Sequence, residues 1–109
     1  MRDRLKTAVT RKTTTLAKNK AKLSIQKKSA RIELDSIKRK KDGSFYKKDI
    51  NRALYLKTKI ELLKRKIAEH DIFYWTNIRK NEKYKQYDTF TTWTKAYQLA
   101  FKYEKQLAA

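Results

Sequence analysis

The sequence contains no proline and a single glycine, Gly43. Strand-rich folds need many tight turns, and turns draw on the fixed φ of proline and on the positive φ that glycine adopts easily. A chain of 109 residues with one such position can make few turns, so long helices joined by few connections remain. The sequence therefore predicts an all-α fold, with residues 1–109 forming a single helical domain.

The one strong turn signal is the run Lys41-Asp42-Gly43-Ser44, which divides the chain unequally. It predicts a long antiparallel helical hairpin with arms over about 15–41 and 45–80. Three consecutive threonines at 13–15 weaken helix propensity and offer N-cap oxygens. Residues 1–12 are therefore expected to form a flexible basic arm or a short separate helix.

Apolar residues recur at helical spacing in both arms of the hairpin. The second arm alternates spacings of four and three, which is typical of coiled-coil packing, at Leu56, Ile60, Leu63, Ile67, His70 and Tyr74. The first arm has a seven-residue repeat at Val9, Leu16, Leu23, Ala30 and Ile37. Polar residues occupy the positions between, so this apolar face is narrow. Either the second arm or a second copy of the chain can cover it, which leaves a homodimer open.

A third helix is predicted over about 89–107, after a stretch without apolar periodicity at 81–88. Asp88 or Thr89 can cap it. Its expected inward face carries aromatic and aliphatic residues, namely Phe90, Trp93, Tyr97, Phe101 and Leu107. Ten of the thirteen aromatic residues lie from Phe73 onward, so this aromatic-rich helix is expected to fold back on the end of the second arm.

Positive charge dominates the chain, with 30 Lys and Arg against 11 Asp and Glu and a net charge of +19. No acid occurs between Asp3 and Glu33, so pairs such as Lys18–Lys22 repel at i,i+4 spacing. Bound phosphates would remove this repulsion and release counterions. The candidate nucleic-acid-binding residues are Arg4, Lys6, Arg11, Lys12, Lys18, Lys20, Lys22, Lys27, Lys28, Arg31, Lys38, Arg39, Lys40 and Lys41.

Other interpretations of the charged segments are weaker or stay open. A membrane-surface helix needs aromatic residues on a wide apolar face, and the first arm has no aromatic residue. Asn19 and Gln26, seven apart, are the candidates for base-specific contacts. The run at 38–41 resembles a nuclear-localisation patch, or supplies cations to the C-terminal end of the first helix. Tyr84 and Tyr87, in the aperiodic stretch, are the candidates for base stacking.

Catalytic, metal-binding and membrane-spanning features are not found in the sequence. The absence of cysteine excludes disulfides, disfavours zinc and suits an intracellular protein. Glu69, His70 and Asp71 adjoin one another, but successive helical residues point about 100° apart and do not converge. No phosphate loop, no apolar run of about 18 residues and no secretory segment is present. We therefore expect no enzyme, no cofactor and no membrane span.

These observations favour a non-enzymatic, largely sequence-nonspecific nucleic-acid-binding structural protein that contacts phosphates through its first helix. RNA is slightly preferred, as in a component of a ribosome-like particle. A DNA-binding or packaging protein of a virus or nucleoid is the nearest alternative. The other class is a small basic helical subunit of a large protein assembly, whose charge meets an acidic partner or lipid headgroups.

Overall fold

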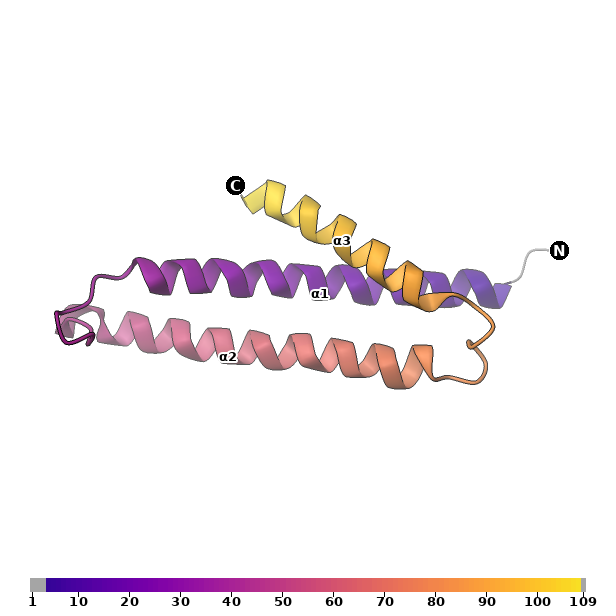
Figure 1. Ribbon diagram of the computed structural model, residues 1–109, viewed down its shortest axis with the longest axis horizontal. Coiled ribbons are helices and arrows are strands. Elements are labelled where there is room, and N and C mark those ends of the chain that lie inside the picture. The colour runs from indigo at the N-terminus through magenta and orange to yellow at the C-terminus, as the bar shows by residue number, and fades with distance from the viewer. Residues whose placement is uncertain (1–3, 109) are drawn as a thin grey trace.

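The computed structural model describes residues 4–108 and contains three long helices. They are α1 (Arg4–Ser36), α2 (Ile50–Phe73) and α3 (Thr89–Ala108), with a 3-10 turn at Lys47–Asp49 and a π-helical turn at Tyr74–Arg79 extending α2. α1 and α2 lie side by side and antiparallel, and α3 folds back across α1 (Figure 1). The molecule is a rod of 66 × 27 × 17 Å. The predicted all-α hairpin with a third helix is confirmed.

The first helix begins earlier than the sequence predicted. It starts at Arg4 and not at about residue 15, so residues 4–12 belong to α1 and form no separate arm. Residues 1–3, the rest of the predicted arm, lie outside the described residues. The threonines do not interrupt the helix, because the fully buried Thr13 hydroxyl donates to the carbonyl of Val9 at 2.7 Å. A hydroxyl that bonds back within its own helix needs no other partner.

The first helix also ends earlier than predicted, at Ser36 and not at 41. The chain turns there because Ile37 and Phe45 pack against the apolar contact between α1 and α2. The loop is held by two backbone hydrogen bonds, from Lys40 to Ser44 at 2.7 Å and from Gly43 to Lys40 at 2.9 Å. Gly43 has a φ of +88°, which a residue with a side chain rarely adopts. The predicted turn therefore exists within a longer loop.

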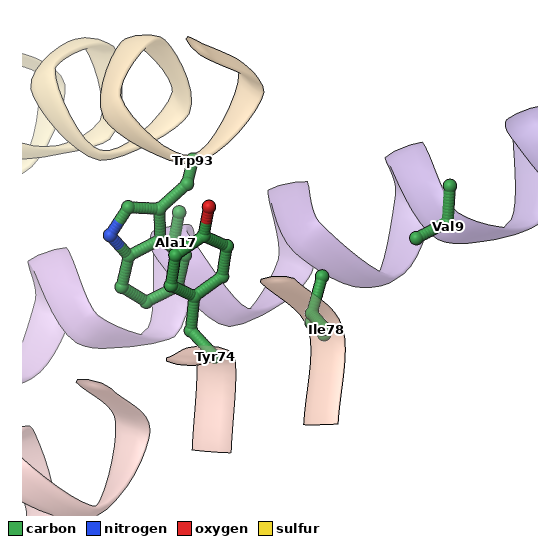
Figure 2. Packing of buried hydrophobic residues seen from close by; sticks show 5 residues of the cluster. All are labelled: Val9, Ala17, Tyr74, Ile78 and Trp93. Atoms are coloured by element: carbon green, nitrogen blue, oxygen red, sulfur yellow. The ribbon is translucent and has the colours of Figure 1, made fainter. Parts of the chain in front are cut away.

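Two apolar clusters hold the rod together. The hairpin cluster, nearer the loop, consists of Ala30, Leu34, Ala53, Leu56 and Ile60. The crossing cluster, where all three helices meet, consists of Val9, Ala17, Tyr74, Ile78 and Trp93. Figure 2 shows the rings of Tyr74 and Trp93 meeting beside Ala17, stacked with centroids 4.3 Å apart and planes at 10°. Off-centre ring stacking adds stability beyond the buried area.

The buried line on α1 differs from the predicted seven-residue repeat. It runs mostly at spacings of four, through Val9, Thr13, Ala17, Ala21, Ile25, Ala30 and Leu34. Leu16, Leu23 and Ile37 are only half-buried. A spacing of four advances about 40° around a helix at each step, so the buried line rotates around α1. It rotates because α1 packs against two helices that lie on different sides of it.

The predicted inward face of α3 is right in the middle of the helix, where Phe101 is also half-buried, and wrong at its two ends. Trp93 is buried and Tyr97 is half-buried, whereas Phe90 and Leu107 are exposed. α3 crosses α1 at an angle and then leaves it, so its C-terminal half is poorly covered (Figure 1). Asp88 caps the helix by accepting a hydrogen bond from the Thr91 amide at 3.0 Å. Hydrogen bonding from the Thr91 side chain, and then from its amide, lowers the pKa of the Asp88 carboxyl.

Candidate nucleic-acid interface

One exposed side of α1 carries a row of cations, of which Lys18 and Lys22 lie beside α3 and Arg11 lies beside Phe73 of α2. Arg4, Arg11, Lys18 and Lys22 follow one another at spacings of seven, seven and four, which places them on one face. All four side chains are exposed, and none forms an ion pair with a described acid. We call these four residues the outer stripe; it spans about 27 Å of the helix.

Polar residues lie beside the outer stripe. Lys12, Asn19 and Gln26 are exposed and share one flank of it at seven-residue spacing. Lys12 adds a fifth cation within reach of the same ligand. The two amides predicted as candidates for base contacts are thus accessible from the solvent.

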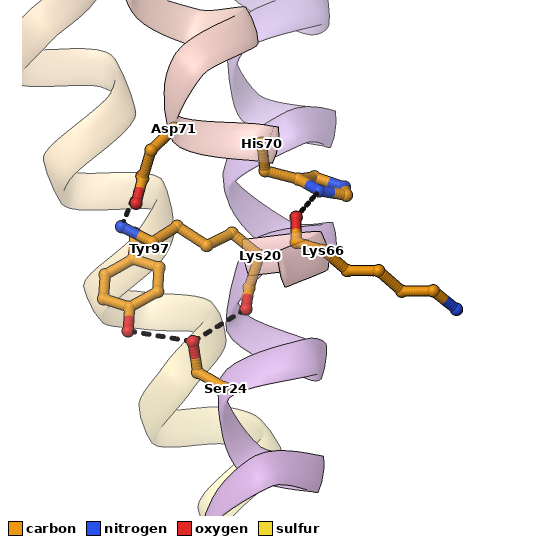
Figure 3. Close-up of polar contacts among 6 residues, drawn as sticks. All are labelled: Lys20, Ser24, Lys66, His70, Asp71 and Tyr97. Atoms are coloured by element: carbon orange, nitrogen blue, oxygen red, sulfur yellow. Dashed lines mark hydrogen bonds and ion pairs between the residues drawn. The ribbon is translucent and has the colours of Figure 1, made fainter. Parts of the chain in front are cut away.

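Lys20 is directed between the helices and not toward solvent. Its ammonium lies 2.7 Å from a carboxylate oxygen of Asp71 and 4.5 Å from the ring centre of Tyr97 (Figure 3). The side chain is 18% exposed, so its charge is largely used within the protein. The first helix alone gives no sign of this, because the partner carboxylate comes from a residue 51 positions later in the chain.

Lys27, Lys28 and Arg31 lie on a further side of α1, next to α2 and α3, where they line a cavity of about 470 Å³. Lys6, near the start of α1, lines a smaller cavity of about 320 Å³ together with Asp88. The predicted cations of the first helix therefore occupy several sides of α1. The outer stripe is one group, and the three cations of the larger cavity form another.

The loop between α1 and α2 is a second concentration of positive charge. Lys38, Arg39, Lys40, Lys41, Lys47 and Lys48 are all exposed in it, and we call these six residues the basic tip. Asp42 accepts hydrogen bonds from the Ser44 hydroxyl at 2.6 Å and from the Ser44 amide at 2.9 Å, which lower the pKa of its carboxyl. Arg39 lies over the ring of Phe45, 4.6 Å from its centre.

The position of the basic tip corrects one interpretation. Because α1 ends at Ser36, Lys38–Lys41 do not lie in its last turn, and that turn contains no basic residue. Neutralisation of the helix end therefore does not explain these cations. They project at one end of the rod, beyond the last turn of α1 (Figure 1).

Two aromatic sets differ in their exposure. Tyr84 and Tyr87, the predicted stacking residues, are half-buried and pack against the crossing cluster. Trp75 and Phe90 are exposed instead, and the guanidinium of Arg79 lies 4.5 Å from the centre of each ring. Sequence reasoning missed this arrangement, although the i,i+4 spacing of Trp75 and Arg79 was a usable signal for half of it.

The residues Glu69, His70 and Asp71 point to different places. Asp71 reaches Lys20, while His70 Nδ1 donates to the carbonyl of Lys66 at 2.7 Å (Figure 3). Glu69 is exposed on a third side. Across residues 4–108 no three His, Cys, Asp or Glu side chains gather where they could hold a metal ion. The same part of the chain contains no helix that combines the length and the apolar character needed to cross a membrane.

Comparisons with other proteins add no relative to this description. No protein-family model matches the chain, and neither the curated proteins nor the solved structures gave a match.

Proposed function

We propose that this protein is a non-enzymatic, largely sequence-nonspecific nucleic-acid-binding protein, which contacts phosphates through the outer stripe and the basic tip. One observation carries the proposal. One side of α1 presents four exposed cations without an ion-pair partner among the described acids. Ordinary exposed helices mix both signs of charge, because neighbouring like charges destabilise a helix.

The kind of cation supports contact with phosphates more than reading of bases. Phosphate contacts fix a protein on a nucleic acid but carry no sequence information. Lysine, which supplies five of the six cations of the basic tip, is a point charge on a flexible stem. Asn19 and Gln26 lie beside the outer stripe, but two amides specify few bases.

We favour RNA over DNA and place the protein in a ribosome-like particle. The support is architectural. The rod is 66 Å long with two small apolar clusters, and its cations lie on several sides and at one end. Such a shape suits a helix enclosed by RNA strands, whereas a DNA-packaging protein needs only one basic face. Purification of the native protein, followed by separate RNase and DNase treatment, tests this choice through the nucleic acid that remains bound.

A subunit of a protein assembly is the second candidate, because one groove has an apolar lining. It measures about 480 Å³ and lies between α1 and α3, where Leu99 is 70% and Tyr103 60% exposed. Lys18 and Lys22 lie on its α1 side, and Glu104 on its α3 side. An apolar floor beside two cations would fit an acidic amphipathic helix. In that case the native protein would release a protein partner, and no nucleic acid, on a salt wash.

The outer stripe can be tested against an equal loss of charge elsewhere. One variant replaces Arg4, Arg11, Lys18 and Lys22 with Gln, and the control replaces Lys64, Lys66, Lys102 and Lys105, which are also exposed. Each removes four positive charges. We expect the stripe variant to bind a mixed-sequence RNA or DNA about 100-fold more weakly than the wild type at 100 mM salt. The control should lose much less affinity, because only the stripe variant loses contacts with phosphates.

The measurement is an equilibrium binding titration, with circular dichroism to check that both variants keep their helices. Equal weakening by the two variants would show that the total charge matters and the stripe does not. No weakening by the stripe variant would remove the proposed interface.

A further inference from the structure

A basic pocket opens where α3 leaves α1. Ala17 lies buried against Trp93 of α3. Ser24, Lys28 and Arg31 follow on the same side of α1, about two, three and four turns further along. In this direction α3 tilts away from α1, so it no longer covers that side (Figure 1). The small residues under α3 are thus followed by cations as soon as the cover ends.

The uncovered side chains line the cavity of about 470 Å³ that all three helices share. We define the basic pocket by its lining, which is Lys20, Ser24, Lys27, Lys28, Arg31, Ile67, Asp71 and Tyr97. Ile67 and Asp71 come from α2 and Tyr97 from α3, while the rest belong to α1. Walls from three helices distinguish this pocket from the outer stripe, whose four cations all belong to α1 and are exposed.

The charge inside the basic pocket is strongly positive. Its one acid, Asp71, is already held by Lys20 at 2.7 Å (Figure 3). Lys27, Lys28 and Arg31 form no ion pair with any described acid. Even Asp35, one turn beyond Arg31, forms none with it, and Glu33 is paired with Arg52. Three positive charges therefore face one cavity without an anion to balance them.

Two hydroxyl groups of the same wall join α3 to α1. The Tyr97 hydroxyl donates to the Ser24 hydroxyl at 3.3 Å, and the latter donates to the Lys20 carbonyl at 2.9 Å (Figure 3). Both hydroxyl protons are thus used within the protein, and the donors left for a small anion are the two ammonium groups and the guanidinium. Phosphate oxygens match this set, because a guanidinium binds two of them at once and ammonium groups bind the others.

We propose that the basic pocket binds one phosphate group of a nucleic acid as a discrete site, separate from the contacts of the outer stripe. This inference rests on the function proposed above. The phosphate belongs either to the backbone or to the end of a strand. In both cases its negative charge offsets part of the positive charge of Lys27, Lys28 and Arg31, which reduces the repulsion between them.

Inorganic pyrophosphate is the probe that tests the site by itself. It is titrated into the full-length protein at constant ionic strength, and binding is followed by NMR through the amide signals of residues 24–31 and Tyr97. The pocket variant replaces Lys27, Lys28 and Arg31 with Gln, and the control replaces Lys64, Lys66 and Lys102, so that both lose three charges. We expect saturable binding by the wild type and the control. The pocket variant should bind pyrophosphate at least about tenfold more weakly than either.

Arg31→Lys refines the test, because it keeps the charge and removes only the two-pronged guanidinium. It should weaken pyrophosphate binding about threefold, whereas an effect of charge alone would leave binding unchanged. Equal losses in the pocket variant and the control would overturn the proposal, as would shifts that never saturate.

The source of the phosphate is then identified with one oligonucleotide in two forms. If only the 5′-phosphorylated form loses affinity in the pocket variant, the site takes a strand end; if the 5′-hydroxyl form loses as much, it takes a backbone phosphate. Failure of this inference differs from failure of the proposed function. If only the pocket inference fails, the outer-stripe variant is still defective in nucleic-acid binding. If only the proposed function fails, the wild type binds pyrophosphate but no nucleic acid.

Discussion

At the level of single residues, Tyr74 lies where all three helices meet. Its ring stacks on Trp93, and its hydroxyl lies 3.4 Å from that of Thr89. The residue is fully buried, and this burial raises the pKa of its phenol above the ordinary value near 10. The folded state therefore favours the neutral phenol more than the unfolded state does.

This pKa shift predicts a loss of stability at alkaline pH. As the pH rises past about 10, Tyr74 ionises in unfolded chains while it stays neutral in folded ones. The free energy of unfolding therefore falls from about pH 10 until the pH reaches the higher pKa of the folded state. Tyr74→Phe lacks this group. At neutral pH the variant should be less stable by about 0.5–1.5 kcal/mol, because it loses the hydrogen bond to Thr89.

Urea denaturation between pH 7 and pH 11 measures the free energy of unfolding of the wild type and of Tyr74→Phe. The contributions of all other titrating groups cancel in the difference between the two proteins. We expect the stability gap between wild type and Tyr74→Phe to narrow above pH 10. Parallel curves over the whole range would show that Tyr74 ionises equally in both states.

Single residues also show where sequence reasoning stops. The stacking of Tyr74 on Trp93 agrees with the predicted inward faces, because both residues lie on strongly periodic segments. The ion pair of Lys20 with Asp71 was not predictable, since a basic residue in an acid-free helix gives no hint of a distant carboxylate. Thr13 was misread as a helix-weakening residue, because propensity describes isolated helices and Thr13 is buried in a packed one.

At the level of elements, α1 is the helix on which the fold is built, because α2 and α3 both pack against it. Ala17 and Ala21 are completely buried on α1, and small residues let two helix backbones approach closely. The seven-residue repeat pointed to leucines and passed over these alanines. A pattern search weighted by hydrophobicity overlooks small residues, although they decide how close α3 comes.

Because α1 and α3 approach closely at Ala17, we expect that α1 tolerates no larger side chain at this position. Ala17→Leu should lower the free energy of unfolding by about 1–3 kcal/mol, because the added carbons meet Trp93 and Tyr74. Ala8 is the matched control, since it lies exposed on the same helix, and Ala8→Leu should change stability by less than about 0.5 kcal/mol.

Urea denaturation of the two variants distinguishes close packing from loose packing. If Ala17→Leu proves as stable as Ala8→Leu, then α3 does not lie against α1 as described.

For the whole molecule, helix number, order and direction followed from the scarcity of proline and glycine and from one turn. Element ends were less predictable. α1 stopped at Ser36 because Ile37 and Phe45 complete the hairpin cluster, which is a contact between segments and not a local signal. The cations of the first helix were identified by composition alone. Their division into outer stripe, internal ion pair and basic pocket needed the positions of α2 and α3.

The central claim is that the rod binds nucleic acid by neutralising phosphates, and the dependence of affinity on salt tests it most directly. The binding constant of the wild-type protein for mixed-sequence RNA and DNA is measured between 50 and 200 mM salt. If about six to ten phosphates are contacted, the log–log slope should lie at about −5 to −9 for duplex DNA and at about −4 to −7 for a single strand. A flat response, or no binding at 100 mM salt, would contradict the proposed function.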